Sequence, residues 1–288
     1  MESSTIEGFP RAPSLRGKFV VIKFGGSSID SAGLERFGND IRLLVGLGIS
    51  PVIVHGGGPE ITDEMKRRNL PVKKVMGLRI TDDSTLEVAK GVLSRINGEI
   101  VRSMQAKGIS SMGMAGSECN TIICRKMPPV KIKDENGQEM LADLGWVGEV
   151  DHVDPKAILV LAKRSTVPVI YPICADMDGH FMNVNADTAA AHIAIALKAE
   201  ELVLVTDVPG LMRVFGDPSS VIGNVRESEF EDLVKDGVVK EGMIPKLEAC
   251  VMAIRSGVSA ANMIDGKDPE ALIGQLLIGR NHGTRITK

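Results

Sequence analysis

Two short apolar segments of this chain end in glycine-rich turns, an arrangement that suits phosphate binding. Residues 19–23 run into Gly-Gly-Ser-Ser at 25–28, and residues 51–55 run into Gly-Gly-Gly-Pro at 56–59. Glycines let main-chain N–H groups approach an anion closely, and the N-terminus of a following helix adds positive potential. Lys23 stands two residues ahead of the first turn. Glycines also end strands for steric reasons, but two such turns so close together favour a phosphate site.

Neither turn belongs to a common nucleotide-binding motif, because the chain contains no GxxxxGK[ST] and no GxGxxG. A nucleoside triphosphate bound here would therefore need a different fold. The histidines show no metal-ligand spacing and the cysteines form no CxxC pair, so we predict no metal site and interpret the cysteines as free thiols. These residues are His55, His152, His180, His192, His282, Cys119, Cys124, Cys174 and Cys250.

The composition is that of a globular protein of one large or two medium domains. The 288 residues are 43% hydrophobic and 25% charged. A net charge of −3 and only 3% aromatic residues argue against a nucleic-acid partner. The first 15 residues lack the apolar run of a secretory signal, and the longest uncharged stretch, 43–59, is broken by glycine and proline. We expect a cytoplasmic protein with no membrane partner.

Strand-like and helix-like segments alternate from residue 18 onward. Strands are predicted at 19–23, 51–55, 167–173, 201–206 and 260–264, and helices at 31–47, from 59, about 82–107, 155–163, 187–199, 226–235 and 244–256. This alternation predicts an α/β fold: a mainly parallel sheet covered by helices on both faces, which makes a three-layer αβα sandwich. Residues 127–150, with Asn136-Gly137, predict a β-hairpin insertion at the sheet edge. Residues 1–17 are expected to form an N-terminal arm before a single domain, 18–288.

Seven motifs carry a resemblance to a known family. They are VIKFGGS at 21–27, VHGGGP at 54–59, GLRITD at 77–82, DLGWVGEV at 143–150, NVNADTA at 183–189, TDVPGL at 206–211 and GMIPK at 242–246. In this order they resemble the amino acid kinase family, and within it the N-acetylglutamate kinases, over residues 18–284. Aspartokinases share the first motif but carry a C-terminal regulatory region for which this chain has no room.

The resemblance implies a function. It implies ATP- and Mg²⁺-dependent phosphorylation of the side-chain carboxylate of N-acetyl-L-glutamate, in arginine biosynthesis. Such a carboxylate, with a pKa of about 4.3, is already ionised at pH 7 and needs no general base. Catalysis therefore requires cations and N–H donors around the transferring phosphoryl group. The resemblance also implies an acceptor-binding lobe at about 18–175 and a nucleotide-binding lobe at about 176–288.

Three residues are expected to be catalytic on this resemblance. Lys23 would contact the transferring phosphoryl group, Lys246 would offset charge on the leaving bridge oxygen, and Asp187 would orient both ammonium groups. The alternatives are a solvated strand-end lysine for Lys23 and a helix N-cap for Asp187. The amides of Gly25, Gly26, Gly57 and Gly58 would hold the phosphoryl oxygens, and Gly57 and Gly58 would also contact the substrate.

The remaining expected site residues bind the two substrates. Arg79 would clamp the non-reacting carboxylate of the acceptor, unless it forms a surface pair with Asp82 or Asp83. Asn183 would hydrogen-bond the same substrate. Thr206, Asp207 and Lys246 would line the nucleotide pocket, although Thr206-Asp207 is also an ordinary strand-to-turn signal.

Three departures from the family pattern leave nucleotide affinity and regulation open. Glu241 replaces a glycine, Gly-Ser-Glu-Cys-Asn at 116–120 loses a lysine, and the ending at 280–284 keeps only Gly-Thr. The rival interpretations are a kinase for carrier-linked α-aminoadipate, in lysine biosynthesis, and a catalytically idle regulatory subunit. The resemblance implies a homodimer, or a hexamer as in arginine-inhibited members. Pro10 and Pro13 would break a long N-terminal helix, so feedback inhibition stays open.

Overall fold

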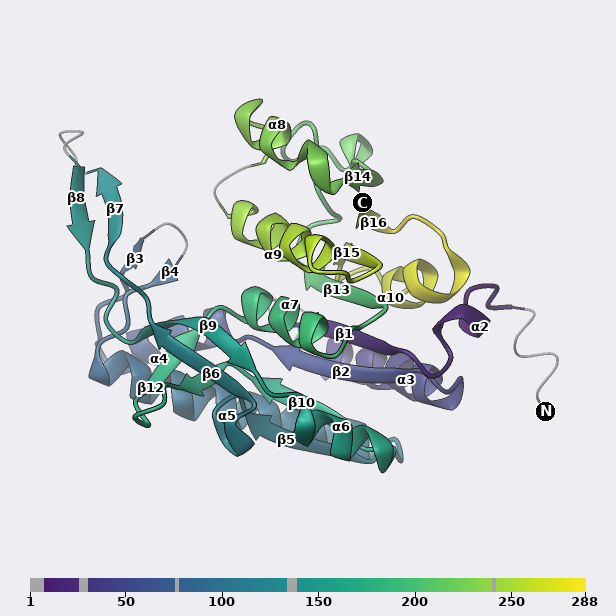
Figure 1. The fold of residues 1–288 in the computed structure, drawn as a ribbon, viewed down its shortest axis with the longest axis horizontal. Coiled ribbons are helices and arrows are strands. Elements are labelled where there is room, and N and C mark those ends of the chain that lie inside the picture. The colour runs from purple at the N-terminus through teal and green to yellow at the C-terminus, as the bar shows by residue number, and fades with distance from the viewer. Residues whose placement is uncertain (1–7, 26–30, 76–77, 134–138, 240–241) are drawn as a thin grey trace.

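The computed structural model describes residues 8–25, 31–75, 78–133, 139–239 and 242–288, and its centre is an eight-stranded sheet (Figure 1). The strand order is β14-β16-β15-β13-β1-β2-β10-β5. In the order of the chain, the bounds are β1 Phe19–Phe24, β2 Ser50–His55, β5 Ser111–Ala115, β10 Val167–Tyr171, β13 Glu201–Thr206, β14 Asn224–Arg226, β15 Ala260–Asp265 and β16 Gly283–Thr287. All pairs are parallel except β15–β16. The predicted mainly parallel sheet is confirmed.

Helices cover both faces of this sheet. They are α3 (Ser31–Gly46), α4 (Gly58–Arg67), α5 (Asp83–Gln105), α6 (Lys156–Lys163), α7 (Ala186–Ala196), α8 (Phe230–Lys235), α9 (Ile244–Arg255) and α10 (Ala271–Ile273). Side chains alternate along a strand, so Val20 and Ile22 of β1 join the core formed with α3 and α5, while Val21 joins the core formed with α7 and α9. Figure 1 shows α7 and α9 together on one side of the sheet. The three-layer sandwich is confirmed.

Besides the central sheet, the structure contains a small closed barrel and two hairpins. The barrel contains β6 (Ile122–Lys126), β9 (Val147–Val153), β11 (Ile173–Ala175) and β12 (Phe181–Val184). The first hairpin pairs β3 (Lys74–Val75) with β4 (Leu78–Arg79), and the second pairs β7 (Val130–Lys133) with β8 (Glu139–Ala142). The second is the predicted insertion, but it forms its own sheet away from the central sheet (Figure 1), since its strands continue from the barrel. Asn136-Gly137 lies outside the described residues.

Two further predicted elements differ from the structure. The strand expected at 167–173 is divided between β10 and β11, because Pro172 has no N–H to donate to a ladder. The helix expected at 226–235 begins only at Phe230, since β14 occupies residues 224–226 and a 3₁₀ turn follows at Glu227–Glu229. At that turn Glu229 accepts a hydrogen bond from the Arg226 amide at 2.6 Å. Further 3₁₀ turns span Glu118–Asn120 and Pro218–Ser220, and a π-helical turn spans Gly274–Ile278.

The described part of the N-terminal segment packs on the domain. The short helix α2 (Ala12–Leu15) buries Ala12 and Leu15 in the α3–α5 core. Arg11 forms an ion pair with Glu201, a buried carboxylate that also binds Arg285 at 3.1 Å. Among the described residues, no helix is both long and apolar enough to cross a membrane.

Candidate active site

A cleft of about 700 Å³ lies where the three central strands end. Strands β13, β1 and β2 are neighbours in the sheet, so their carboxyl ends meet at one edge, the usual ligand site of open parallel sheets. The cleft is lined by every predicted site residue that the structure describes: Lys23, Gly25, Gly57, Gly58, Arg79, Asn183, Asp187, Thr206, Asp207 and Lys246. Gly26 lies outside the described residues.

The centre of the cleft is a carboxylate held between two ammonium groups. Lys23 Nζ lies 3.0 Å from Asp187 Oδ1, and Lys246 Nζ donates to Asp187 Oδ2 at 2.8 Å. Burial by itself would raise the pKa of Asp187, but the two lysine charges outweigh burial and lower its pKa to about 2. Asp187 is therefore an anion at neutral pH, with one positive charge in excess across the three groups. Such a centre can bind phosphate oxygens but cannot accept a proton readily.

The start of α7 holds Asp187 in this position. Asn185 is the N-cap, and its Oδ1 accepts hydrogen bonds from the amides of Asp187 and Thr188 at 2.8 and 3.1 Å. The alternative that Asp187 is the N-cap is therefore wrong, and its carboxylate is left for the lysines. Asn185 also lines the cleft, and our sequence analysis missed it. An Asn immediately before the alanine-rich helix was the available signal.

Three helix N-termini converge on the cleft. The first turns of α4, α7 and α9 contribute Gly58 and Pro59, Ala186 and Asp187, and Lys246 respectively. Each helix N-terminus carries a partial positive charge, although Asn185 caps two amides of α7 and the prolines Pro59 and Pro245 have no N–H. Together with the two lysines, they make the cleft suited to a polyanion such as a nucleoside triphosphate.

The two glycine turns touch each other at the bottom of the cleft. A Cβ atom on Gly25 would lie 3.2 Å from the Gly56 nitrogen, and a Cβ on Gly57 would lie 2.7 Å from Ile96 Cδ1 and 2.9 Å from Leu93 Cδ2. A side chain at position 25 would push the two turns apart, and one at position 57 would push the second turn away from α5. Gly25 therefore permits a close approach of main chain to main chain, and Gly57 permits close packing of its turn on α5.

We expect Gly57→Ala to lower the free energy of unfolding by about 1–3 kcal/mol, because the new methyl group overpacks against α5. Gly58→Ala is the matched control, since nothing lies within 4 Å of its Cβ position. We expect that variant to stay within about 1 kcal/mol of the unsubstituted protein. Urea unfolding of both variants measures the difference, and equal losses would contradict the packing argument.

Arg79 is buried and reaches across to α4. Its Nη2 donates to Gly58 O at 2.9 Å and to Thr62 Oγ1 at 2.7 Å, and burial lowers the pKa of the guanidinium. The alternative surface pair is wrong. Asp82 caps α5 through the Thr85 amide at 2.8 Å, and Asp83 accepts from Trp146 Nε1 at 2.6 Å.

The other side of the cleft is more apolar. Thr206 Oγ1 donates to Val208 O at 2.6 Å, so its hydroxyl serves the turn after β13, while Asp207 is exposed. Beyond this turn the cleft is lined by Val208, Met212, Phe215, Val238 and Met243. An apolar surface beside a cationic centre suits a nucleotide, whose base has apolar faces and whose phosphates are anionic.

Comparison with known proteins identifies the family. The amino acid kinase family model matches residues 18–264. An acetylglutamate kinase from Methanothrix thermoacetophila is 44% identical over a 288-residue alignment that covers 99% of this chain and 98% of that protein. The chain belongs to the amino acid kinase family. An acetylglutamate kinase from Archaeoglobus fulgidus is 39% identical over 283 residues, 98% of this chain and 97% of its own.

Solved structures show the same amino acid kinase fold. An N-acetylglutamate synthase from Neisseria gonorrhoeae, complexed with coenzyme A and N-acetyl-glutamate, has a TM-score of 0.83 at 22% identity. The match covers 97% of this chain and 61% of that one. A carbamate kinase from Giardia lamblia bound to AMP-PNP has a TM-score of 0.67 at 15% identity, covering 94% of this chain and 99% of that one.

Two of the three departures from the amino acid kinase pattern fall on residues that the structure describes. None of residues 116–120 lines the cleft, and Glu118 of this loop accepts a hydrogen bond from the Ala115 amide at 2.7 Å. Thr284 of the C-terminal Gly-Thr does not line the cleft, but its Oγ1 accepts from the amide of Leu211, which does, at 2.8 Å. Glu241 lies outside the described residues.

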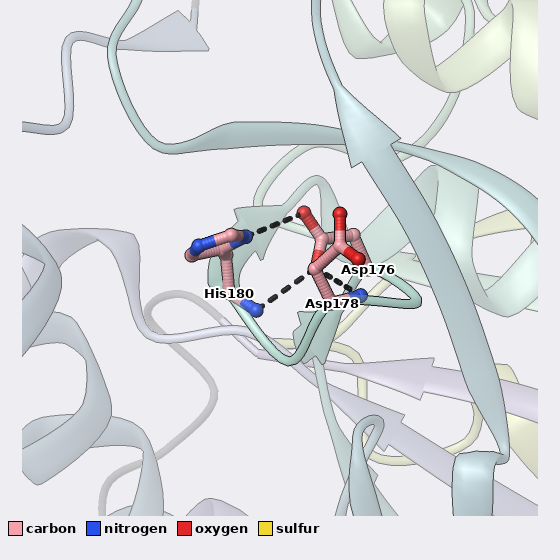
Figure 2. Close-up of side chains that lie close together, drawn as sticks. All are labelled: Asp176, Asp178 and His180. Atoms are coloured by element: carbon pink, nitrogen blue, oxygen red, sulfur yellow. Dashed lines mark hydrogen bonds and ion pairs between the residues drawn. The ribbon is translucent and has the colours of Figure 1, made fainter.

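Asp176, Asp178 and His180 form a separate cluster in this amino acid kinase, at the turn between β11 and β12 (Figure 2). Their potential ligand atoms lie within 4.8 Å of one another. Asp176 accepts from the amides of Asp178 and His180 at 3.0 and 2.9 Å and pairs with the His180 ring at 3.1 Å. These bonds close the turn, and none of the three residues lines the cleft.

Proposed function

We propose that this protein uses ATP to phosphorylate the side-chain carboxylate of N-acetyl-L-glutamate, giving the acyl phosphate in arginine biosynthesis. The relatives that are 37–44% identical over nearly the whole chain bear the name acetylglutamate kinase. The observation that carries the proposal is the pair of lysines on Asp187 beside the glycine turns. Transfer of phosphate to a carboxylate requires cations and N–H donors but no general base, and that centre supplies them.

In this proposal the two lysines stabilise different oxygens. Lys23, at the end of β1, meets the oxygens of the transferring phosphoryl group together with the amides of Gly25, Gly26, Gly57 and Gly58. Lys246, at the start of α9, meets the bridge oxygen on which negative charge accumulates as the bond breaks. Asp187 holds the two ammonium groups apart and in position. Because the acceptor carboxylate is already ionised, no proton is moved.

The two substrates occupy opposite parts of the cleft. Arg79 and Asn183 hold the acceptor, next to β4 and the barrel, in keeping with an acceptor-binding lobe at about 18–175. Thr206 and Asp207 hold the nucleotide with the apolar residues beyond them, in the lobe at about 176–288. Asn183 comes from the second range but reaches the acceptor through β12 of the barrel.

The residues present fit Mg²⁺ bound with the nucleotide. Of the described residues that line the cleft, Asp187 and Asp207 carry carboxylates. Asp187 is already paired with two lysines, so Asp207 is the carboxylate that would face the metal. Mg²⁺ usually keeps waters and phosphate oxygens as its other ligands, and when bound it neutralises charge on those phosphates.

The proposed function is tested with a panel of acceptors. Purified protein is incubated with MgATP and N-acetylglutamate, and the acyl phosphate is trapped with hydroxylamine. We expect hydroxamate with N-acetylglutamate. Hydroxamate only with α-aminoadipate derivatives would overturn the acceptor assignment. Nucleotide binding without any hydroxamate would overturn the catalytic assignment in favour of an idle subunit.

We also propose that the protein is a homodimer formed through the central sheet. The strand β5 is the last in the sheet order, and Met112 on it is 53% exposed. An open strand edge is a template for pairing with another chain. Sedimentation is expected to give twice the mass of the 30.8 kDa chain, and repeating it with arginine tests for hexamer formation.

Arg79→Lys is expected to raise KM for N-acetylglutamate by about 30- to 100-fold, because lysine cannot make a bidentate contact with a carboxylate. KM for ATP should stay within about threefold, since no nucleotide contact is lost. The matched control is Arg95→Lys, an exposed residue of α5 paired with Glu99 at 2.7 Å. Steady-state kinetics with each substrate varied give both constants, and an equal rise in both would contradict the assignment.

A further inference from the structure

Two buried polar side chains lie beneath the second glycine turn. His55, at the end of β2, has 0% exposure, and Asn97 of α5 has 5%. His55 Nδ1 lies 3.0 Å from Gly56 O, and Asn97 Nδ2 lies 3.1 Å from His55 Nε2. Neither side chain lines the cleft, so neither touches a substrate there. They form a chain of hydrogen bonds from α5 to the main chain of the turn.

The partners of this chain determine where the proton lies. Asn97 Nδ2 also donates to Val169 O of β10 at 2.8 Å, which orients the amide with its nitrogen toward the ring. Since that nitrogen is only a donor, His55 Nε2 must accept, and the ring proton is on Nδ1. Nδ1–H then donates to Gly56 O, which is only an acceptor. One neutral tautomer satisfies both ring nitrogens, the Asn97 amide nitrogen and Gly56 O.

The hydrogen bond from His55 to Gly56 O fixes the direction of the planar peptide between Gly56 and Gly57. The Gly56 N–H donates to Phe24 O of β1 at 3.2 Å, and Gly56 O is held by His55 on the buried side. No peptide bond among the described residues is cis, so the Gly57 N–H points in the opposite direction from Gly56 O. Gly57 lines the cleft, and among the described residues no acceptor is paired with its N–H. The inward carbonyl therefore directs an amide outward.

We propose that His55 and Asn97 are positioning residues that hold the Gly56 carbonyl inward and thereby aim the Gly57 N–H at the transferring phosphoryl group. The inference rests on the proposed function, which places that group beside Gly57. An N–H aimed before the reaction stabilises charge in the transition state without reorganising, and loss of one such donor costs about 10²- to 10³-fold in rate. His55 acts only through the peptide that it holds.

Two further features keep the arrangement in place. Burial lowers the pKa of His55 to about 4; the bond to Gly56 opposes that shift and the charge of Lys23 adds to it. The ring therefore stays neutral and keeps Nε2 free to accept. On the other side of Asn97, a Cβ on Gly113 of β5 would lie 1.8 Å from Asn97 Oδ1. The lack of a side chain at position 113 therefore makes room for the Asn97 amide.

Two substitutions of His55 distinguish the roles of its two ring nitrogens. In His55→Asn the side-chain amide can place a donor near the position of Nδ1, whereas in His55→Gln the longer amide reaches the position of Nε2. Only the first can still hold Gly56 O. We expect kcat of His55→Gln to be about 30-fold below that of His55→Asn, with KM for the acceptor within about threefold between them. His152→Gln, an exposed residue of β9, is the control.

Stability is measured on the same samples by urea unfolding. A merely structural histidine would lower stability in both variants with kcat unaffected among the folded molecules. Equal kcat in the two variants, or the lower kcat in His55→Asn, would overturn the proposal. If His55→Gln does not fold, Asn97→Leu serves in its place. That variant removes the donor to Nε2, and its kcat is expected to fall about tenfold.

A spectroscopic measurement is independent of the acceptor. The chain has five histidines, so the ring ¹⁵N signals of His55 can be assigned by difference with His55→Asn. The Nδ1–H tautomer is expected in the unsubstituted protein, and a mixture of tautomers in Asn97→Leu. An Nε2–H tautomer would overturn the inference even if the kinase activity is confirmed. If no acceptor is phosphorylated, the proposed function fails, and ATP affinity of the two His55 variants replaces kcat as the readout.

Discussion

Replacing Lys23 by methionine is expected to lower kcat by about 10³-fold while KM for ATP changes by less than about threefold. The reason is that the oxygens facing Lys23 gain negative charge in the transition state. In ground-state ATP the γ-phosphate would already be held by the glycine amides, with Mg²⁺ neutralising part of the phosphate charge when bound, but in the transition state negative charge spreads over the oxygens that Lys23 faces. An interaction that strengthens only there affects turnover rather than binding. Methionine keeps the unbranched stem and removes the charge.

The control for this substitution is Lys18→Met. Lys18 precedes the same strand, is 56% exposed at its side chain and pairs with Glu200 at 3.6 Å, so its loss should leave kcat unchanged. Steady-state kinetics with N-acetylglutamate, together with ATP titration of the enzyme, separate turnover from binding. An unchanged kcat in Lys23→Met would remove Lys23 from the mechanism, and a parallel loss of ATP affinity would make it a binding residue.

Asp187→Asn is the second substitution with a large expected effect, a fall in kcat of about 10²- to 10³-fold. The amide cannot neutralise either ammonium group, so Lys23 and Lys246 repel each other and leave the positions in which Asp187 holds them at 3.0 and 2.8 Å. Loss of one partner from a buried charge cluster also lowers stability, here by about 2–4 kcal/mol. Kinetics and urea unfolding measure the two effects, with the exposed Asp151→Asn as control.

A double substitution tests whether the charges act as one unit. If Asp187 works by orienting Lys23, the kcat of Lys23→Met with Asp187→Asn should fall only slightly below that of Lys23→Met alone. Additive losses, about 10⁵- to 10⁶-fold in total on the estimates above, would mean that Asp187 has a separate role. A bell-shaped pH profile with an acid limb near pH 6 would contradict the description of Asp187 as an anion with a pKa of about 2.

The central strands and long helices were predictable because their signals are local. β13 occupies residues 201–206 as predicted, and the helix expected at about 82–107 is α5, Asp83–Gln105. The barrel strands β6, β9 and β12 were missed, as were β5 and β16. Of these, β5, β6, β12 and β16 have only four or five residues each, and β9 obtains its partners in β6 and β12 from 20 or more residues away, so the local sequence carries little signal for them.

The residues of the candidate site likewise divide into those with a local sequence signal and those without one. Lys23 and both glycine turns were found from their neighbours alone, because a glycine turn between a strand and a helix is a local feature. Asn185 had a local signal that was overlooked. His55 had none: in the sequence it only precedes three glycines, and its partner Asn97 lies 42 residues further along the chain.

By itself, the sequence determined the layered α/β architecture, the two amide-rich turns and, through its motifs, the family. Only the tertiary structure decided that Lys246 reaches the same carboxylate as Lys23, that Arg79 is buried against α4, and that a neutral imidazole supports the Gly56 peptide. The physical reason is that backbone conformation follows from adjacent residues, whereas the charge state and direction of a buried polar group depend on partners that the fold alone brings within hydrogen-bond distance.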